Sequence, residues 1–104
     1  MDNFKVIYRI LRYLEKAMDY DEPDMEAISV EALGITKQRW AALLEMLVRS
    51  GYIDGVSVKR SADGTFLLSV SLPRITLSGL EYLKENSMMQ KAANIAKGIA
   101  DVIP

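Results

Sequence analysis

The N-terminal part of the chain has apolar side chains at every third or fourth position, as one face of an α-helix requires. Over residues 3–18 these side chains form two neighbouring stripes, and basic side chains occupy the opposite face. The first stripe consists of Phe4, Ile7, Leu11, Leu14 and Met18, and the second of Val6, Ile10, Tyr13 and Ala17. So wide an apolar face predicts a helix, capped by Asn3, that packs against more than one other element.

Three later positions carry a common helix-start pattern: an apolar residue, a hydroxyl residue, and a second apolar residue four positions further on. The hydroxyl satisfies a free amide of the first turn, and the apolar pair fixes the direction in which the chain enters the helix. The three hydroxyl residues are Ser29, Thr36 and Thr76. Gly34 limits the first helix to about one turn, and Gly51 ends the second, in which Trp40 is expected to anchor the core.

After Gly51 the pattern changes to the alternation of apolar and polar side chains that is typical of β-strands. Residues 52–60 and 65–72 are predicted to pair as a hairpin, because Asp63-Gly64 between them is a strong turn signal. Gly55 suggests a bulge, and Pro73, which cannot donate to a strand ladder, is expected to end the second strand. Helical periodicity then returns over residues 76–85 and again from Ser87.

This order of elements predicts an α+β fold, a winged helix-turn-helix. It comprises three N-terminal helices, a two-stranded β-hairpin wing and C-terminal helices. We expect a winged-helix domain over residues 1–86. Residues 87–104 are expected to form an amphipathic helix that packs on this domain or on a partner chain.

The chain resembles the YjcQ family of small winged-helix proteins from Gram-positive bacteria and their prophages. The resemblance covers nearly the whole chain and rests on residues 31–35, 51–56 and 75–86, of which the third block is the most specific. It implies a winged-helix fold and a phage-associated origin. It implies no enzymatic activity, so it transfers no catalytic residue to this chain.

Composition narrows the possible chemistry further. The 104 residues include no cysteine and no histidine, which excludes thiolate nucleophiles, Ser-His-Asp catalysis and metal sites built from these ligands. No phosphate-binding loop or nucleophile elbow occurs either. We therefore expect a protein that is not an enzyme, with no cofactor, no metal and no evident small-molecule substrate.

The N-terminus shows no targeting signal. It lacks the basic and then apolar order of a signal peptide, and no apolar run approaches the ~20 residues that span a membrane. A cytoplasmic protein that does not bind membranes is expected.

The net charge of −1 hides an uneven distribution of charged side chains. Residues 19–31 contain six acidic side chains and no basic one, whereas residues 32–74 contain six basic and three acidic ones. In a helix-turn-helix, the N-terminal turns of the second helix enter the major groove of DNA. The predicted DNA-binding residues are Thr36, Lys37, Gln38, Arg39, Lys59, Arg60 and Arg74. Thr36 would hold a phosphate, and Gln38 and Arg39 would contact base edges.

The alternative is a winged-helix adaptor that binds protein and no DNA. The C-terminal segment carries an apolar face that is too broad to stay in water on a small domain. Its predicted interface residues are Met88, Met89, Ala92, Ile95 and Ile99. This face either folds back on the first helix or pairs with a second chain to form a homodimer, which would supply the two-fold symmetry common among DNA-binding regulators.

Overall fold

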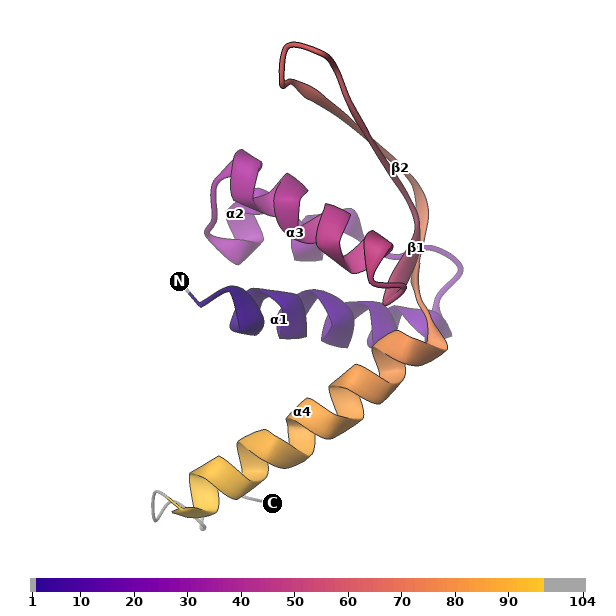
Figure 1. Ribbon diagram of the computed structural model, residues 1–104. Coiled ribbons are helices and arrows are strands. Elements are labelled where there is room, and N and C mark those ends of the chain that lie inside the picture. Colours follow the sequence, from indigo (N-terminus) through magenta and orange to yellow (C-terminus); the bar gives the residue numbers. More distant parts are fainter. Residues whose placement is uncertain (1, 97–104) are drawn as a thin grey trace.

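The computed structural model describes residues 2–96, with side chains for all of these except residues 60, 66 and 88–96 (Figure 1). In chain order the elements are α1 Asn3–Lys16, η1 Ala17–Asp19, η2 Met25–Ile28, α2 Val30–Leu33, α3 Lys37–Arg49, β1 Ile53–Arg60, β2 Phe66–Ile75 and α4 Leu77–Ala96. The η elements are single tight turns of helix. The fold is the predicted α+β winged-helix arrangement, in which α2 and α3 form the helix-turn-helix and β1 with β2 forms the wing.

The helix-turn-helix begins and turns where its local signals place it. The Ser29 hydroxyl accepts a hydrogen bond from the Ala32 amide at 3.1 Å, and the Thr36 hydroxyl accepts one from the Arg39 amide at 3.1 Å. Gly34 ends α2 with a φ of 67°, in the left-handed region that glycine adopts without steric cost. These caps confirm the predicted starts of α2 and α3.

The cap of α1 differs from the prediction by one residue. Asp2, and not Asn3, accepts the hydrogen bond from the Phe4 amide, at 2.9 Å. Asn3 is already the first residue of the helix. A carboxylate at the cap is additionally favoured by the positive end of the helix dipole, which explains why the acid takes this position.

The core forms where α1, α3 and the lower part of the hairpin meet. Its largest fully buried side chains are Ile10, Leu11, Ile28, Leu33, Leu44, Leu47, Ile53 and Val6. Of the two stripes predicted for α1, the second has Val6, Ile10 and Ala17 buried and Tyr13 half-buried. The other is exposed at its ends, because Phe4 is 69% and Met18 54% accessible. Those two positions extend beyond the elements that cover the middle of α1.

The wing is an antiparallel hairpin whose register changes near its base. Ile53 pairs with Ile75, but beyond Gly55 the register shifts, so that Val56 pairs with Val70. Gly55 has a φ of 80°, which confirms the predicted bulge. The expectation that Pro73 ends β2 is wrong, since the strand continues to Ile75. Pro73 lies at this irregularity, outside the paired positions, and therefore removes no ladder hydrogen bond.

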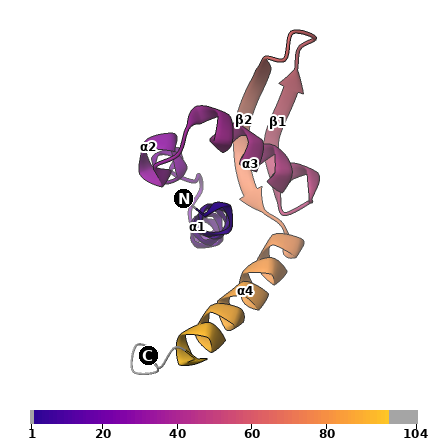
Figure 2. The same cartoon turned by 60° about the vertical axis from the view of Figure 1, so that its left-hand side comes forward.

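A single helix, α4, replaces the two helices predicted for the C-terminal part. It runs through Ser87 without a break, so the expected boundary between residues 86 and 87 falls inside it. Thr76 starts α4: its hydroxyl accepts from the Gly79 amide at 3.2 Å and donates to the Gly51 carbonyl. The first turns of α4 lie beside α1, and the rest of the helix extends away from the body (Figures 1 and 2).

Candidate nucleic-acid interface

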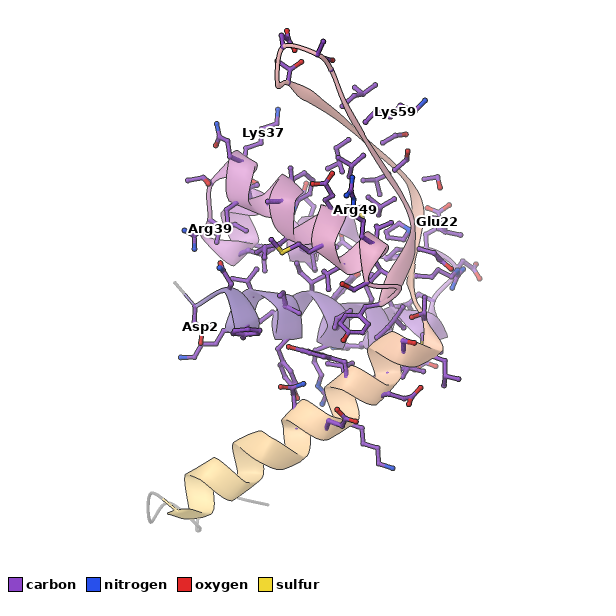
Figure 3. All side chains as sticks on the ribbon, in the orientation of Figure 1. Asp2, Glu22, Lys37, Arg39, Arg49 and Lys59 are labelled. Carbon is purple, nitrogen blue, oxygen red and sulfur yellow. The ribbon has the colours of Figure 1, made fainter. Side chains whose placement is uncertain are left out.

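The first turn of α3 holds three of the predicted DNA-binding residues together. Thr36, Lys37 and Gln38 are all exposed, at the end of α3 that lies away from α4 (Figure 1). In Figure 3 the Lys37 side chain extends from this turn on the side of the wing. The free amides of a first turn add positive partial charge to that of Lys37. This turn can therefore approach a phosphate or a base edge with side chains and backbone together.

The outer face of α3 continues from this turn toward the base of the wing. Helical spacing places Ala42, Met46 and Arg49 in line with Gln38, on the side opposite the buried Leu44. Arg49 contacts the Glu45 carboxylate at 3.5 Å, so part of its charge is compensated. On this face, the small Ala42 and the flexible Met46 therefore lie between the polar side chains of Gln38 and Arg49.

Arg39 and Arg74 are not brought to this face. The Arg39 guanidinium donates to the Asn3 side-chain oxygen at 2.9 Å, and Figure 3 shows it on the α1 side of α3, apart from Lys37. The Arg74 guanidinium donates to the Asp21 carbonyl at 3.4 Å, at the base of the wing. Each arginine thus links two segments of the fold, a role that its local sequence does not indicate.

The wing carries the other two predicted residues. The exposed Lys59 pairs across the hairpin with Leu67, and Arg60 pairs with Phe66 as the last residue of β1. In the turn, the hydroxyl and amide of Thr65 donate to one Asp63 carboxylate oxygen, at 2.7 and 3.1 Å. These bonds stabilise the ionised carboxylate and lower the pKa of Asp63. The turn therefore places one negative charge at the tip of the wing. Phosphate contacts are therefore expected along β1 and not at the tip.

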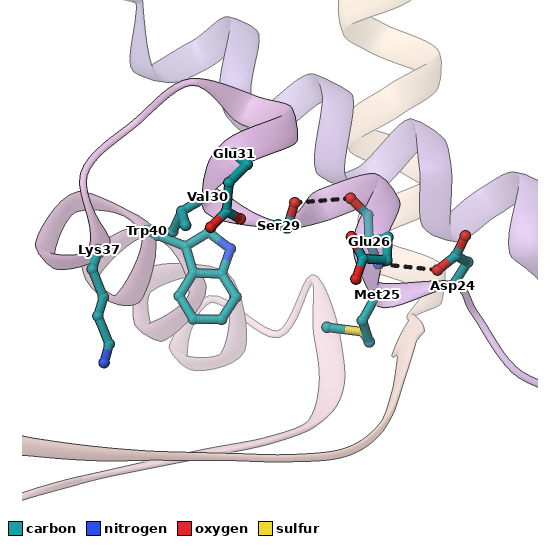
Figure 4. A pocket seen from close by; sticks show the side chains of 8 residues that line it. All are labelled: Asp24, Met25, Glu26, Ser29, Val30, Glu31, Lys37 and Trp40. Atoms are coloured by element: carbon teal, nitrogen blue, oxygen red, sulfur yellow. Dashed lines mark hydrogen bonds between the residues drawn. The ribbon is translucent and has the colours of Figure 1, made fainter.

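Acidic side chains lie on the other side of Lys37. A cavity of about 410 Å³ opens between η2, α2 and α3 (Figure 4). Its lining residues are Asp24, Met25, Glu26, Ser29, Val30, Glu31, Lys37 and Trp40. The first turn of α3 therefore borders the acidic cavity on one side and continues into the outer face of the helix on the other. The positive charge of Lys37 therefore has carboxylates of the cavity lining on one side.

Sequence reasoning did not identify this cavity. Trp40, the predicted core anchor, is half-buried: it packs against the core and also lines the cavity. Its indole N–H donates to the Ile28 carbonyl at 2.9 Å, which fixes the ring. The three-residue spacing of Lys37 and Trp40 indicates that both side chains lie on the same face of α3. The sequence does not indicate that the acidic segment lies against this face, because its position depends on how the loop folds.

The predicted oligomer interface lies outside the side chains that the structure describes. Met88, Met89, Ala92 and Ile95 belong to the described backbone of α4, and Ile99 lies beyond it. The homodimer therefore stays a prediction. Within residues 2–96, no group of three or more acidic side chains is placed to hold a metal ion. In the same range, no helix combines the length and apolar character needed to cross a membrane.

Comparison with known proteins places the chain next to one family. The profile of the family described as "YjcQ protein" matches residues 8–102. The chain is similar to "Uncharacterized protein YjcQ" from Bacillus subtilis (strain 168), with 33% identity over 76 residues. That alignment covers 73% of this chain and 78% of the relative. No solved structure matches the chain.

Proposed function

The chain belongs to the YjcQ family, and we propose that this member binds double-stranded DNA through the first turn of α3. The observation that carries the proposal is the exposure of Thr36, Lys37 and Gln38 together at the start of the second helix of a helix-turn-helix. That turn is the part of such a motif that enters the major groove. A regulatory role in a phage or prophage is a further expectation from the family resemblance.

The proposed roles follow from side-chain chemistry. Lys37 and the free amides of the first turn would contact phosphates, which carry most of the binding free energy but no sequence information. Gln38 would hydrogen-bond to an adenine edge. Lys59 would contact the backbone beside the major groove from β1. Arg39 and Arg74 are left out of this set, because each binds another segment of the fold.

The expected binding is weak and sensitive to salt. With about three phosphate contacts, the affinity should fall with a slope of about −3 in a plot of log K against log salt concentration. The carboxylates of Asp24, Glu26 and Glu31 beside Lys37 weaken the attraction further. This acidic neighbourhood favours the second candidate function, a winged-helix adaptor that binds protein and no DNA.

Fluorescence anisotropy of a labelled duplex distinguishes the two candidates. We expect the double variant Lys37→Ala plus Gln38→Ala to bind DNA about tenfold more weakly than the wild type at low salt. The salt slope should also decrease by about 1, since one phosphate contact is lost. Lys84→Ala, which removes an exposed lysine from α4, is the matched control and should bind like the wild type.

Two outcomes would contradict DNA binding by α3. If the wild type shows no binding at the lowest salt concentration, the adaptor is favoured. If Lys84→Ala weakens binding as much as the double variant does, the attraction is a general charge effect and the first turn of α3 has no special role.

A further inference from the structure

The cavity beside α3 has the size and lining of a small-molecule site. Its volume of about 410 Å³ lies within the range of about 300–1,000 Å³ that is common for ligand pockets. Met25, Val30 and Trp40 supply an apolar lining, and each of them is only partly buried. The cavity as a whole is not visible in the sequence, because its residues come from three elements that meet only in the fold.

The charges around the cavity select the kind of ligand. Glu26 and Glu31 each add a carboxylate, and the carboxylate of Asp24 accepts a hydrogen bond from the Glu26 amide at 3.0 Å. Lys37 contributes the one ammonium group of the lining. A ligand that fills the space must therefore combine an apolar body with a positive charge. An anion of the same shape would be repelled, since like charges at short distance are unfavourable.

Trp40 strengthens the preference for a cation. The hydrogen bond from its indole N–H to the Ile28 carbonyl holds the ring in place. In Figure 4 the ring borders the same space as Met25, with Glu31 beside it. An indole face attracts cations through its quadrupole, so a fixed ring with the Glu31 carboxylate beside it forms a partly prepared site for an amine.

We propose that this cavity binds a small organic cation that carries an aromatic or aliphatic body. The proposal goes beyond DNA binding and does not depend on it. The two sites share Lys37, which also lines the cavity, so the variants that test the cavity are placed at other residues. Its occupant can be detected directly. Trp40 is the single tryptophan of the chain, so its fluorescence reports on this cavity.

The test is a fluorescence titration of the full chain with three probes that share one body: phenylbutylamine, phenylbutanol and phenylbutyrate. We expect saturable binding of the amine, with an affinity about fivefold higher than that of the alcohol. The acid should bind more weakly than the alcohol. Added salt should reduce the preference for the amine and leave the alcohol unaffected.

Two exposed acids provide matched variants. Glu31→Gln should weaken the binding of the amine about fivefold and change the binding of the alcohol little, because it removes one carboxylate from the lining. Glu22→Gln removes an acid of the same segment that does not line the cavity, and should bind all three probes like the wild type. Both positions are exposed, so neither variant should disturb folding.

The proposal fails if the amine gives no saturable change, if the three probes bind alike, or if both variants reduce amine binding equally. It also fails if a short peptide with leucine between two lysines binds more than tenfold more tightly than the amine, because the cavity would then be part of a peptide-docking surface. None of these outcomes depends on DNA. Loss of DNA binding and loss of this site are therefore separate results.

Discussion

Leu44→Ala is expected to lower the free energy of unfolding by about 3 kcal/mol, which would be among the largest effects of any single truncation in the chain. Leu44 lies in the middle of α3 and is 1% exposed. It belongs to the core cluster that joins α1, α3 and the base of the wing. Truncation removes buried methyl groups and leaves a cavity that close-packed neighbours fill only in part.

Chemical denaturation followed by circular dichroism measures this effect, with Met46→Ala as the control. Met46 lies on the same helix but is 56% exposed, so its truncation should change the free energy of unfolding by less than about 0.5 kcal/mol. Equal losses at the two positions would show that α3 does not bury the face containing Leu44. The orientation of its first turn would then also be wrong.

Gly55→Ala is the second large effect and is expected to destabilise the wing by about 3 kcal/mol or more. A β-carbon at this position would lie 2.1 Å from the Leu72 carbonyl oxygen. The backbone φ of 80° adds strain for any residue with a side chain. Because the obstacle is backbone and not a flexible side chain, the hairpin must shift to relieve the clash.

Gly51→Ala separates the steric clash from the backbone strain. Gly51 has a similar φ of 77°, but a β-carbon there would meet no atom within 4 Å. It should therefore cost only the conformational strain, about 1–2 kcal/mol. Comparison of the two variants by thermal unfolding tests the bulge. If Gly51→Ala and Gly55→Ala lose the same stability, β1 and β2 do not approach each other closely at this point.

The parts of the fold that the sequence predicts correctly depend on local chemistry. A hydroxyl cap such as Ser29 or Thr36 satisfies an amide three residues away, and Gly34 adopts its own left-handed conformation, so both can be recognised in a short stretch. The predictions for Pro73 and Ser87 are wrong for the opposite reason. Whether a proline costs a ladder bond, or a serine caps a helix, depends on the surrounding fold.

The same distinction applies to the candidate site. The exposure of Lys37 and Gln38 follows from their place at the start of an amphipathic helix, which the sequence shows. The partners of Arg39 and Arg74 are 36 and 53 residues away in the chain. No local pattern predicts that Asn3 and Asp21 accept hydrogen bonds from these two arginines. The cavity at Trp40 was missed because the acidic segment could not be placed against α3 from sequence alone.

Amide chemical shifts of the isotope-labelled chain, recorded as a DNA duplex is added at low salt, locate the proposed interface most directly. We predict the largest changes at residues 36–38, with further changes along β1 near Lys59 and little change at Arg74. Shift changes confined to α1 and α4, or none at DNA concentrations well above those of the protein, would contradict the proposal that the first turn of α3 binds DNA.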